Sequence, residues 1–146
     1  MMTTIYINEL MFKETQSHSR LFRVSHKLQT IIDKGFCEVN GCIFLKALFE
    51  ARPNLANCYS DKTGREGFLN GIEVDLFCNK NYYYNAIYYS EGIIAKWKKQ
   101  FPGKAGTLVI SPNENGYHIT ICCSRNDEPQ WTTIADNNIP LMMVSF

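Results

Sequence analysis

The hydrophobic positions of the chain change their period part-way along its length. In the earlier part, apolar residues recur every three or four positions, which is typical of helices with one buried face. This spacing predicts helices over residues 19–34, 42–51 and 88–100, with Ser90 as a candidate N-cap of the last. The segment IEVDLF predicts a strand over 72–77. The first part of the chain is therefore expected to be mainly helical.

Further along, the pattern is that of strands. β-rich runs at 106–111, 116–123, 130–136 and 140–146 are divided by the turn clusters PNENG, SRNDEP and NNIP. Helices followed by an antiparallel meander are typical of an α+β fold. We expect a single domain over 1–146, with N-terminal helices packed on a C-terminal antiparallel sheet.

Composition and charge exclude several classes of protein. The chain has 146 residues, of which 45% are hydrophobic and 20% charged, as in globular proteins. Its formal net charge of +1 gives no reason to expect a nucleic acid or an anionic membrane as partner. No apolar run approaches the roughly 20 residues of a membrane-spanning helix, and the start, MMTTIYINELMFKETQ, has no secretory signal pattern. We expect a protein made in the cytoplasm without a signal peptide.

The cysteines form no recognisable metal framework. Their spacings include no CxxC pair, so we expect neither a zinc site nor any other metal or cofactor. In the cytoplasm they would stay reduced. Free cysteines are among the most buried residue types, so most of them are interpreted as core residues. The six are Cys37, Cys42, Cys58, Cys78, Cys122 and Cys123.

One cysteine stands out by its position. Cys42 follows an Asn-Gly turn and opens the predicted helix over 42–51. It is either a buried apolar residue or a nucleophile at a helix N-terminus, where the helix dipole favours the thiolate. The second interpretation makes Cys42, rather than Cys37 or Cys58, the reactive thiol. That interpretation requires a base.

The candidate base is His118. His18 and His26 lie in polar surroundings, whereas His118 lies in the predicted strand YHITIC after a flexible turn. A histidine on a strand can also be purely structural. The HITI element matches the motif of two-histidine phosphoesterases, but those proteins need a second copy, which neither HSRL nor HKLQ supplies. The remaining hypothesis pairs His118 with Cys42.

Three stretches resemble the papain-like cysteine peptidase superfamily, in particular its NlpC-type and type VI secretion amidase branch. They are NGCIFLKALFEA, FPGKAGTLVIS and GYHITICC. The resemblance implies a papain-like core in which Cys42 is the nucleophile and His118 the general base, with a third polar group that orients the imidazole. The family often has Cys-Ser-Gly at the nucleophile, whereas this chain has Cys-Ile-Phe.

The third group is predicted from the hairpin around SRNDEP. A regular hairpin would set His118 opposite Asp136, at the end of the run over 130–136. Asp127 lies in the turn itself and is the weaker candidate. Asp136 could equally be an ordinary turn residue. The backbone N–H of Cys42 is the expected oxyanion donor.

Two functions follow. The first is a cysteine amidase or peptidase; the resemblance implies an amide of peptidoglycan stem peptides as substrate, export as an antibacterial effector to a target cell periplasm, and a cognate immunity protein as partner. A protein deamidase or protease toxin would use the same chemistry. The alternative is a non-enzymatic cytosolic immunity or inhibitor protein that binds a bacterial toxin, with the aromatic cluster over 81–89 as one source of interface residues. Close approach of Cys42 and His118 favours the enzyme, and burial of Cys42 in apolar packing favours the binding protein.

Overall fold

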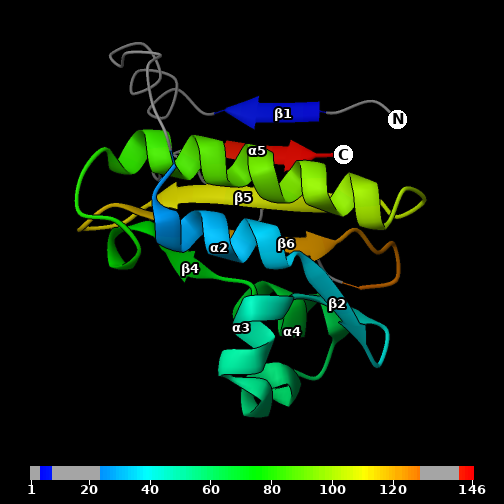
Figure 1. Ribbon diagram of the computed structural model, residues 1–146. Helices are drawn as coiled ribbons and strands as arrows, with labels where there is room; N and C mark the ends of the chain where they lie inside the picture. The colour runs from blue at the N-terminus through cyan, green and yellow to red at the C-terminus, as the bar shows by residue number, and fades with distance from the viewer. Residues whose placement is uncertain (1–3, 8–23, 129–141) are drawn as a thin grey trace.

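The computed structural model describes residues 4–7, 24–128 and 142–146, and within them the fold is α+β. Its main layer is a five-stranded sheet in the order β1-β7-β5-β6-β4, with every neighbouring pair antiparallel (Figure 1). The strands are β1 (Thr4–Ile7), β4 (Ile72–Glu73), β5 (Gly106–Pro112), β6 (Tyr117–Cys123) and β7 (Met142–Ser145).

Helices α2 (His26–Lys34) and α5 (Tyr82–Gln100) cover one face of this sheet (Figure 1). They form the main core with the strand residues that point toward them, and their apolar side chains are almost fully buried. A Cβ at Gly92 would lie 2.7 Å from Ile32 Cδ1, so the missing side chain lets the two helices approach closely. Its almost fully buried members include Leu28, Ile93, Trp97, Leu108, Ile110, Ile119 and Ile121.

A second group of elements, which we call the lower layer, lies below the sheet in Figure 1. It begins with a hairpin of β2 (Phe36–Val39) and β3 (Cys42–Leu45), whose turn residues Asn40 and Gly41 both have positive φ. Asn-Gly is the usual pair for such a two-residue turn. The layer continues with α3 (Lys46–Ala51), the 3-10 turn η1 (Pro53–Asn57) and α4 (Lys62–Leu69).

The predicted helix over 42–51 is wrong in its first four residues. Residues 42–45 form β3, and only 46–51 are helical. The Asn-Gly turn sends the chain back along β2, so Cys42 pairs with Val39. All four residues of β3 are buried, so the run lacks the polar alternation that marks a half-exposed strand.

The other predicted helices are confirmed with changed starts. Within the described residues, α2 occupies 26–34 of the predicted 19–34, with the Ser25 side chain accepting a hydrogen bond from Leu28 N as its cap. Helix α5 begins six residues before the predicted start. Ser90 is therefore not an N-cap but an interior residue, whose hydroxyl donates to Ala86 O.

Several predicted strands are present, but they do not form the expected meander, because β5 lies between β6 and β7, and β1, which the pattern did not predict, pairs with β7. The strands predicted over 106–111, 116–123 and 140–146 are present, with small shifts at their ends. The strand predicted over 72–77 stops at Glu73 and continues as the 3-10 turn η2 (Val74–Leu76). The run over 130–136 lies outside the described residues. No helix in the described part of the chain is long and apolar enough to cross a bilayer.

Candidate functional site

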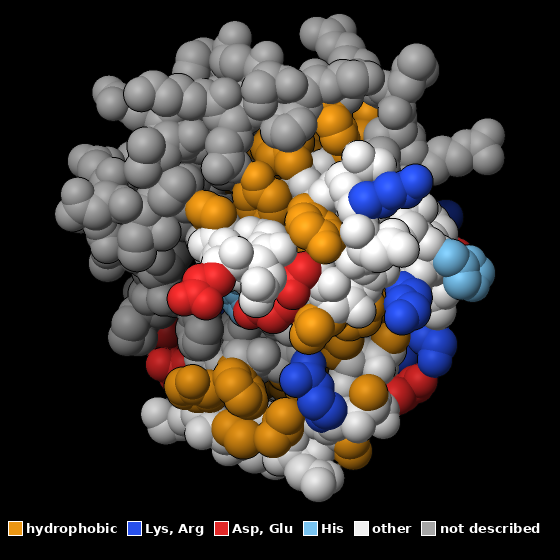
Figure 2. All heavy atoms as spheres, turned by 90° about the vertical axis from the view of Figure 1, so that its left-hand side faces the viewer, with side chains coloured by type: hydrophobic (Ala, Val, Ile, Leu, Met, Phe, Trp, Pro, Cys, Tyr) orange, Lys and Arg blue, Asp and Glu red, His pale blue; other side chains and the backbone are white. Residues whose placement is uncertain are grey.

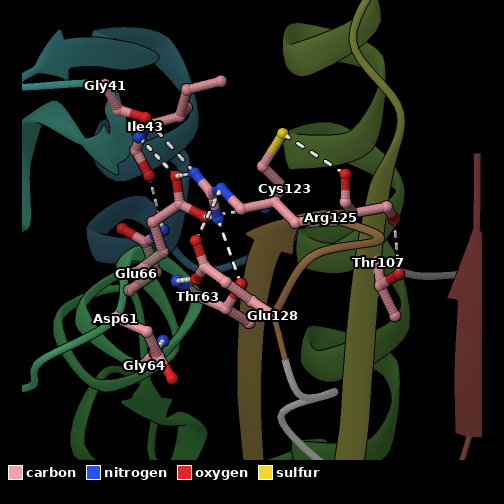
Figure 3. Close-up of polar contacts among 12 residues, drawn as sticks. Gly41, Ile43, Asp61, Thr63, Gly64, Glu66, Thr107, Cys123, Arg125 and Glu128 are labelled. Carbon is pink, nitrogen blue, oxygen red and sulfur yellow. Dashed lines mark hydrogen bonds and ion pairs between the residues drawn. The ribbon is translucent and has the colours of Figure 1, made fainter.

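A buried ion pair joins the lower layer to the sheet. Glu66 on α4 is fully buried, and Arg125, just after β6, grips both of its carboxylate oxygens at 2.7 and 2.8 Å (Figure 3). The same carboxylate accepts hydrogen bonds from Ile43 N at 2.6 Å and Cys123 N at 2.8 Å. The hydrogen bonds to Glu66 raise the pKa of Arg125 above its usual value. One side chain thus connects α4, the hairpin and β6.

Two further polar side chains extend this junction. Asn70 is 1% exposed; its amide nitrogen donates to Ile43 O and Ile121 O, and its oxygen accepts from Leu45 N. The Thr120 hydroxyl donates to Gly67 O at 2.6 Å. The buried polar side chains of Asn70 and Thr120 thus both have hydrogen-bond partners, as burial requires. The lower layer is therefore fixed in position against β6.

Cys42 does not lie at a helix N-terminus. It begins β3, is 2% exposed, and packs in a small cluster with Phe44, Ala56 and Leu69. Burial, followed by the negative charge of Glu66, raises the pKa of its thiol above the usual value. A thiol in these surroundings is held in the less nucleophilic, protonated form.

The described contacts do not bring Cys42 and His118 together. Glu66 holds Ile43, the neighbour of Cys42, against Cys123 at the far end of β6. His118 lies five positions before Cys123, roughly 17 Å along the strand at the usual rise per residue. The structure gives the imidazole a different set of neighbours.

His118 pairs with a carboxylate that the sequence interpretation did not select. Its Nδ1 lies 2.9 Å from Glu73 Oε1, where a protonated Nδ1 donates to the carboxylate, and Asn113 donates to the other oxygen of Glu73. A Cβ at Gly71 would lie 2.9 Å from His118 Cε1, so the ring rests against the Gly71 backbone. His118 lies opposite Glu73 of β4 on one side and Ser111 of β5 on the other. Its ring contacts the β4 side, where Glu73 and Gly71 lie.

Two residues, Asp136 and Asp127, were predicted as candidates to orient the imidazole of His118. Asp136 lies outside the described residues, and Asp127 is exposed in the turn after β6. The sequence pattern placed Glu73 in the strand predicted over 72–77. It did not specify that this strand would pair with β6. In the described ranges 4–7, 24–128 and 142–146, no three His, Cys, Asp or Glu side chains are grouped as metal ligands.

The outer side of the lower layer carries an exposed aromatic surface, which we call the α4 surface and define by Tyr59, Arg65 and Phe68. The rings of Tyr59 and Phe68 are 5.4 Å apart, and the two residues are 43% and 40% exposed. Arg65 Nε donates to Tyr59 O at 2.7 Å, which ties the loop to the helix. Figure 2 shows hydrophobic side chains in both the upper and the lower part of one face of the molecule.

A small cavity adjoins the α4 surface. Its volume is about 100 Å³, and its lining includes Cys42, Phe44, Phe49, Ala56 and Arg65. Phe44 and Phe49 stack with their rings 5.5 Å apart. Arg65 is half-buried between the exposed aromatic pair and this cavity, and aromatic residues and arginine are enriched in protein–protein interfaces.

The sequence matches one protein family over nearly its whole length. The profile of the uncharacterized protein PM0498 family matches residues 6–142. The chain belongs to this family. The matched range includes strands β4, β5 and β6 of the sheet and the whole lower layer. No curated protein and no solved structure matches the chain.

Proposed function

We propose that the protein is a non-enzymatic binding protein that recognises another protein, of the kind represented by bacterial immunity proteins that neutralise a toxin. The observation that carries this proposal is the α4 surface. Tyr59 and Phe68 are two of the three large hydrophobic side chains that are exposed in the described part of the chain. They lie next to each other and next to an arginine.

The physical basis is the composition and rigidity of this surface. Tyr, Phe and Arg are enriched in protein interfaces, and Tyr and Arg are frequent among the residues that dominate binding energy. The helix that carries Arg65 and Phe68 is held to the sheet through the buried Glu66 carboxylate. A surface that is already ordered loses less conformational entropy on binding.

The cysteine amidase hypothesis has weaker support. A papain-like core needs the nucleophile at the first turn of a helix, beside its histidine, whereas Cys42 begins a strand and His118 pairs with Glu73. Peptidoglycan as substrate, export to a target cell and a cognate immunity protein as partner all depend on that hypothesis. They remain predictions.

The proposal is tested with a purified partner. Affinity purification of the tagged protein from its natural source, followed by mass spectrometry, identifies the partner, and calorimetry then gives the dissociation constant. Replacing both aromatic residues (Tyr59→Ala with Phe68→Ala) should weaken binding by tenfold or more, since interface aromatic residues each contribute about 1–2 kcal/mol. Arg65→Glu should weaken it further. If the partner is a toxin, the same variants should lose protection of growing cells.

The matched control is Lys99→Glu, a charge reversal at an exposed position in the last turn of α5. It should leave the dissociation constant unchanged. Two results would overturn the proposal. One is an affinity that none of the α4 surface variants changes. The other is hydrolysis of peptidoglycan fragments or of the partner that disappears in Cys42→Ala.

A further inference from the structure

A cleft lies where helices α2 and α5 begin, away from the residues that define the α4 surface. Its volume is about 470 Å³, and it is bordered by the first residues of α2, by the loop over 76–81 and by the start of α5. Cavities of this size are large enough to hold a small ligand or a few side chains of a partner.

The charges around this cleft have one sign. His26, Lys27 and Lys80 line it and are exposed, and no Asp or Glu side chain is among the described residues that line it. On the face shown in Figure 2, Lys, Arg and His side chains lie mainly in the right half and most Asp and Glu side chains in the left half. Cationic side chains around a cleft attract a partner of opposite charge.

The cleft also has an apolar side. Leu76 is 69% exposed, more than any other large hydrophobic side chain in the described part of the chain, and Phe77 lines the cleft next to it. A small inorganic anion would cover neither side chain. A peptide segment that carries both carboxylates and an apolar side chain would contact both parts of the cleft.

The cleft is preformed. Asn85 is 3% exposed; its oxygen accepts from Ser25 N at 2.8 Å, and its nitrogen donates to Lys80 O and Asn81 O. The Ser25 hydroxyl donates to Phe77 O at 2.9 Å. Two buried or half-buried side chains therefore fix all three walls relative to one another, although Asn81 adopts the left-handed conformation that costs energy for most residues.

We infer that this cleft binds an acidic segment of a partner protein, with carboxylates paired to Lys27 and Lys80 and an apolar side chain packed on Leu76. The inference goes beyond the proposed function, because it rests on elements other than the α4 surface. A test of this cleft therefore does not depend on which partner binds the α4 surface. The charged contacts are with Lys27 and Lys80, and the apolar contact is with the exposed Leu76.

The probe is the peptide Asp-Glu-Leu-Phe-Glu-Asp with blocked ends. It is titrated into isotope-labelled protein while the amide resonances are followed by NMR. We expect saturable shifts confined to residues 25–27, 76–81 and 85. The affinity should fall as salt is added, because exposed charge pairs are screened. The double charge reversal, Lys27→Glu with Lys80→Glu, should weaken binding about tenfold or more.

Four controls make the result decisive. Lys99→Glu, 18 positions and roughly 27 Å along α5 from Asn81, should bind the peptide like the wild type. The peptide Asn-Gln-Leu-Phe-Gln-Asn tests the charges, and Asp-Glu-Ala-Ala-Glu-Asp tests the apolar contact; both should bind more weakly than the probe. Leu76→Ala should weaken binding of the probe peptide without removing the salt dependence of that binding.

Several outcomes would overturn the inference. Binding of the uncharged peptide as tightly as the acidic one would mean a purely apolar contact. Equal shifts with inorganic phosphate would mean a general anion site at the start of α2. Absence of saturable shifts in the cleft, with the protein folded, would mean that acidic segments do not bind there.

Discussion

The two faces of strand β6 are held by different forces. Residues Ile119 and Ile121 point into the apolar core under α2 and α5. On the opposite face, His118 pairs with Glu73 and Thr120 donates to Gly67 O. Next to this face lies the buried Glu66, with four hydrogen bonds from three segments. One strand thus joins an apolar interface and a polar one.

The apolar and the polar interface should therefore respond differently to single substitutions. Apolar packing is roughly proportional to the area buried and has little direction, so neighbouring side chains can partly compensate for a loss. A buried carboxylate is directional, and removing it leaves several donors without acceptors. The polar interface therefore positions the lower layer more exactly, and it is also the more sensitive to a single substitution.

The largest expected effect is that of Glu66→Ala. The substitution removes the close ion pair of the half-buried Arg125, leaving the longer one to Glu128, and it removes the acceptor of two backbone N–H groups. Breaking such a pair typically costs about 3–5 kcal/mol of the free energy of unfolding. Urea denaturation should show this loss. Amide hydrogen exchange should rise most in β2, β3 and α4, because the lower layer loses its attachment.

The matched comparison is Leu28→Ala in the apolar interface. Leu28, on α2, is fully buried in the main core, and its truncation should cost about 2–5 kcal/mol of the free energy of unfolding. Exchange should then rise in α2 and α5 rather than in the lower layer. If both variants raise exchange equally throughout the chain, the two interfaces unfold as one unit and the contrast drawn above is wrong for stability.

The periodicity of the sequence was sufficient for the apolar interface. Regular spacing predicted α2 over its described part, most of α5, and the strands β5 and β6, since each has one buried apolar face. Burial of such faces is what hydrophobic patterning reports. The α+β class followed from the order of these elements.

The polar interface could not be predicted in the same way. Helix α4 is absent from the elements that the periodicity predicts, because its buried face consists of Thr63, Gly64, Glu66 and Gly67 with few apolar side chains. A glutamate in such a segment is usually exposed, and nothing local indicates that Arg125 will meet it. The pairing of His118 with Glu73 likewise depends on which strands become neighbours.

The error at Cys42 has the same origin. A short run of buried apolar residues has no clear period, so strand and helix cannot be distinguished from it. The Asn-Gly turn before Cys42 was the better guide, because such a turn joins two antiparallel strands. The segment that resembles a cysteine-bearing helix therefore begins with strand β3 instead.

A smaller effect is expected for Glu128→Gln, at the edge of the polar interface. Glu128 accepts a hydrogen bond from Thr63 N at 2.7 Å, which satisfies a free N–H in the first turn of α4 and lowers the pKa of the carboxyl. A lowered pKa means stabilisation that is present above the unfolded-state pKa of about 4.3 and is lost as the pH falls through the folded-state pKa. At pH 7 the variant should be less stable by about 1 kcal/mol.

The measurement is urea denaturation of wild type and variant at several pH values. Their difference in free energy of unfolding should shrink toward acid pH. Glu114→Gln, at an exposed position of the β5–β6 turn, is the control substitution. A difference that stays constant between neutral and acid pH would show that the charge of Glu128 does not contribute.

The smallest effect concerns the order in which the thiols react, and it separates the two proposed functions. Thiolates react with iodoacetamide, so a buried thiol with a raised pKa should react slowly. Cys42 is such a thiol, whereas Cys58 is exposed. Near neutral pH, peptide mass spectrometry should show Cys58 modified first and Cys42 only after unfolding in urea. Rapid labelling of Cys42 in the folded protein would instead favour the cysteine amidase, because only an activated thiol would react from that position.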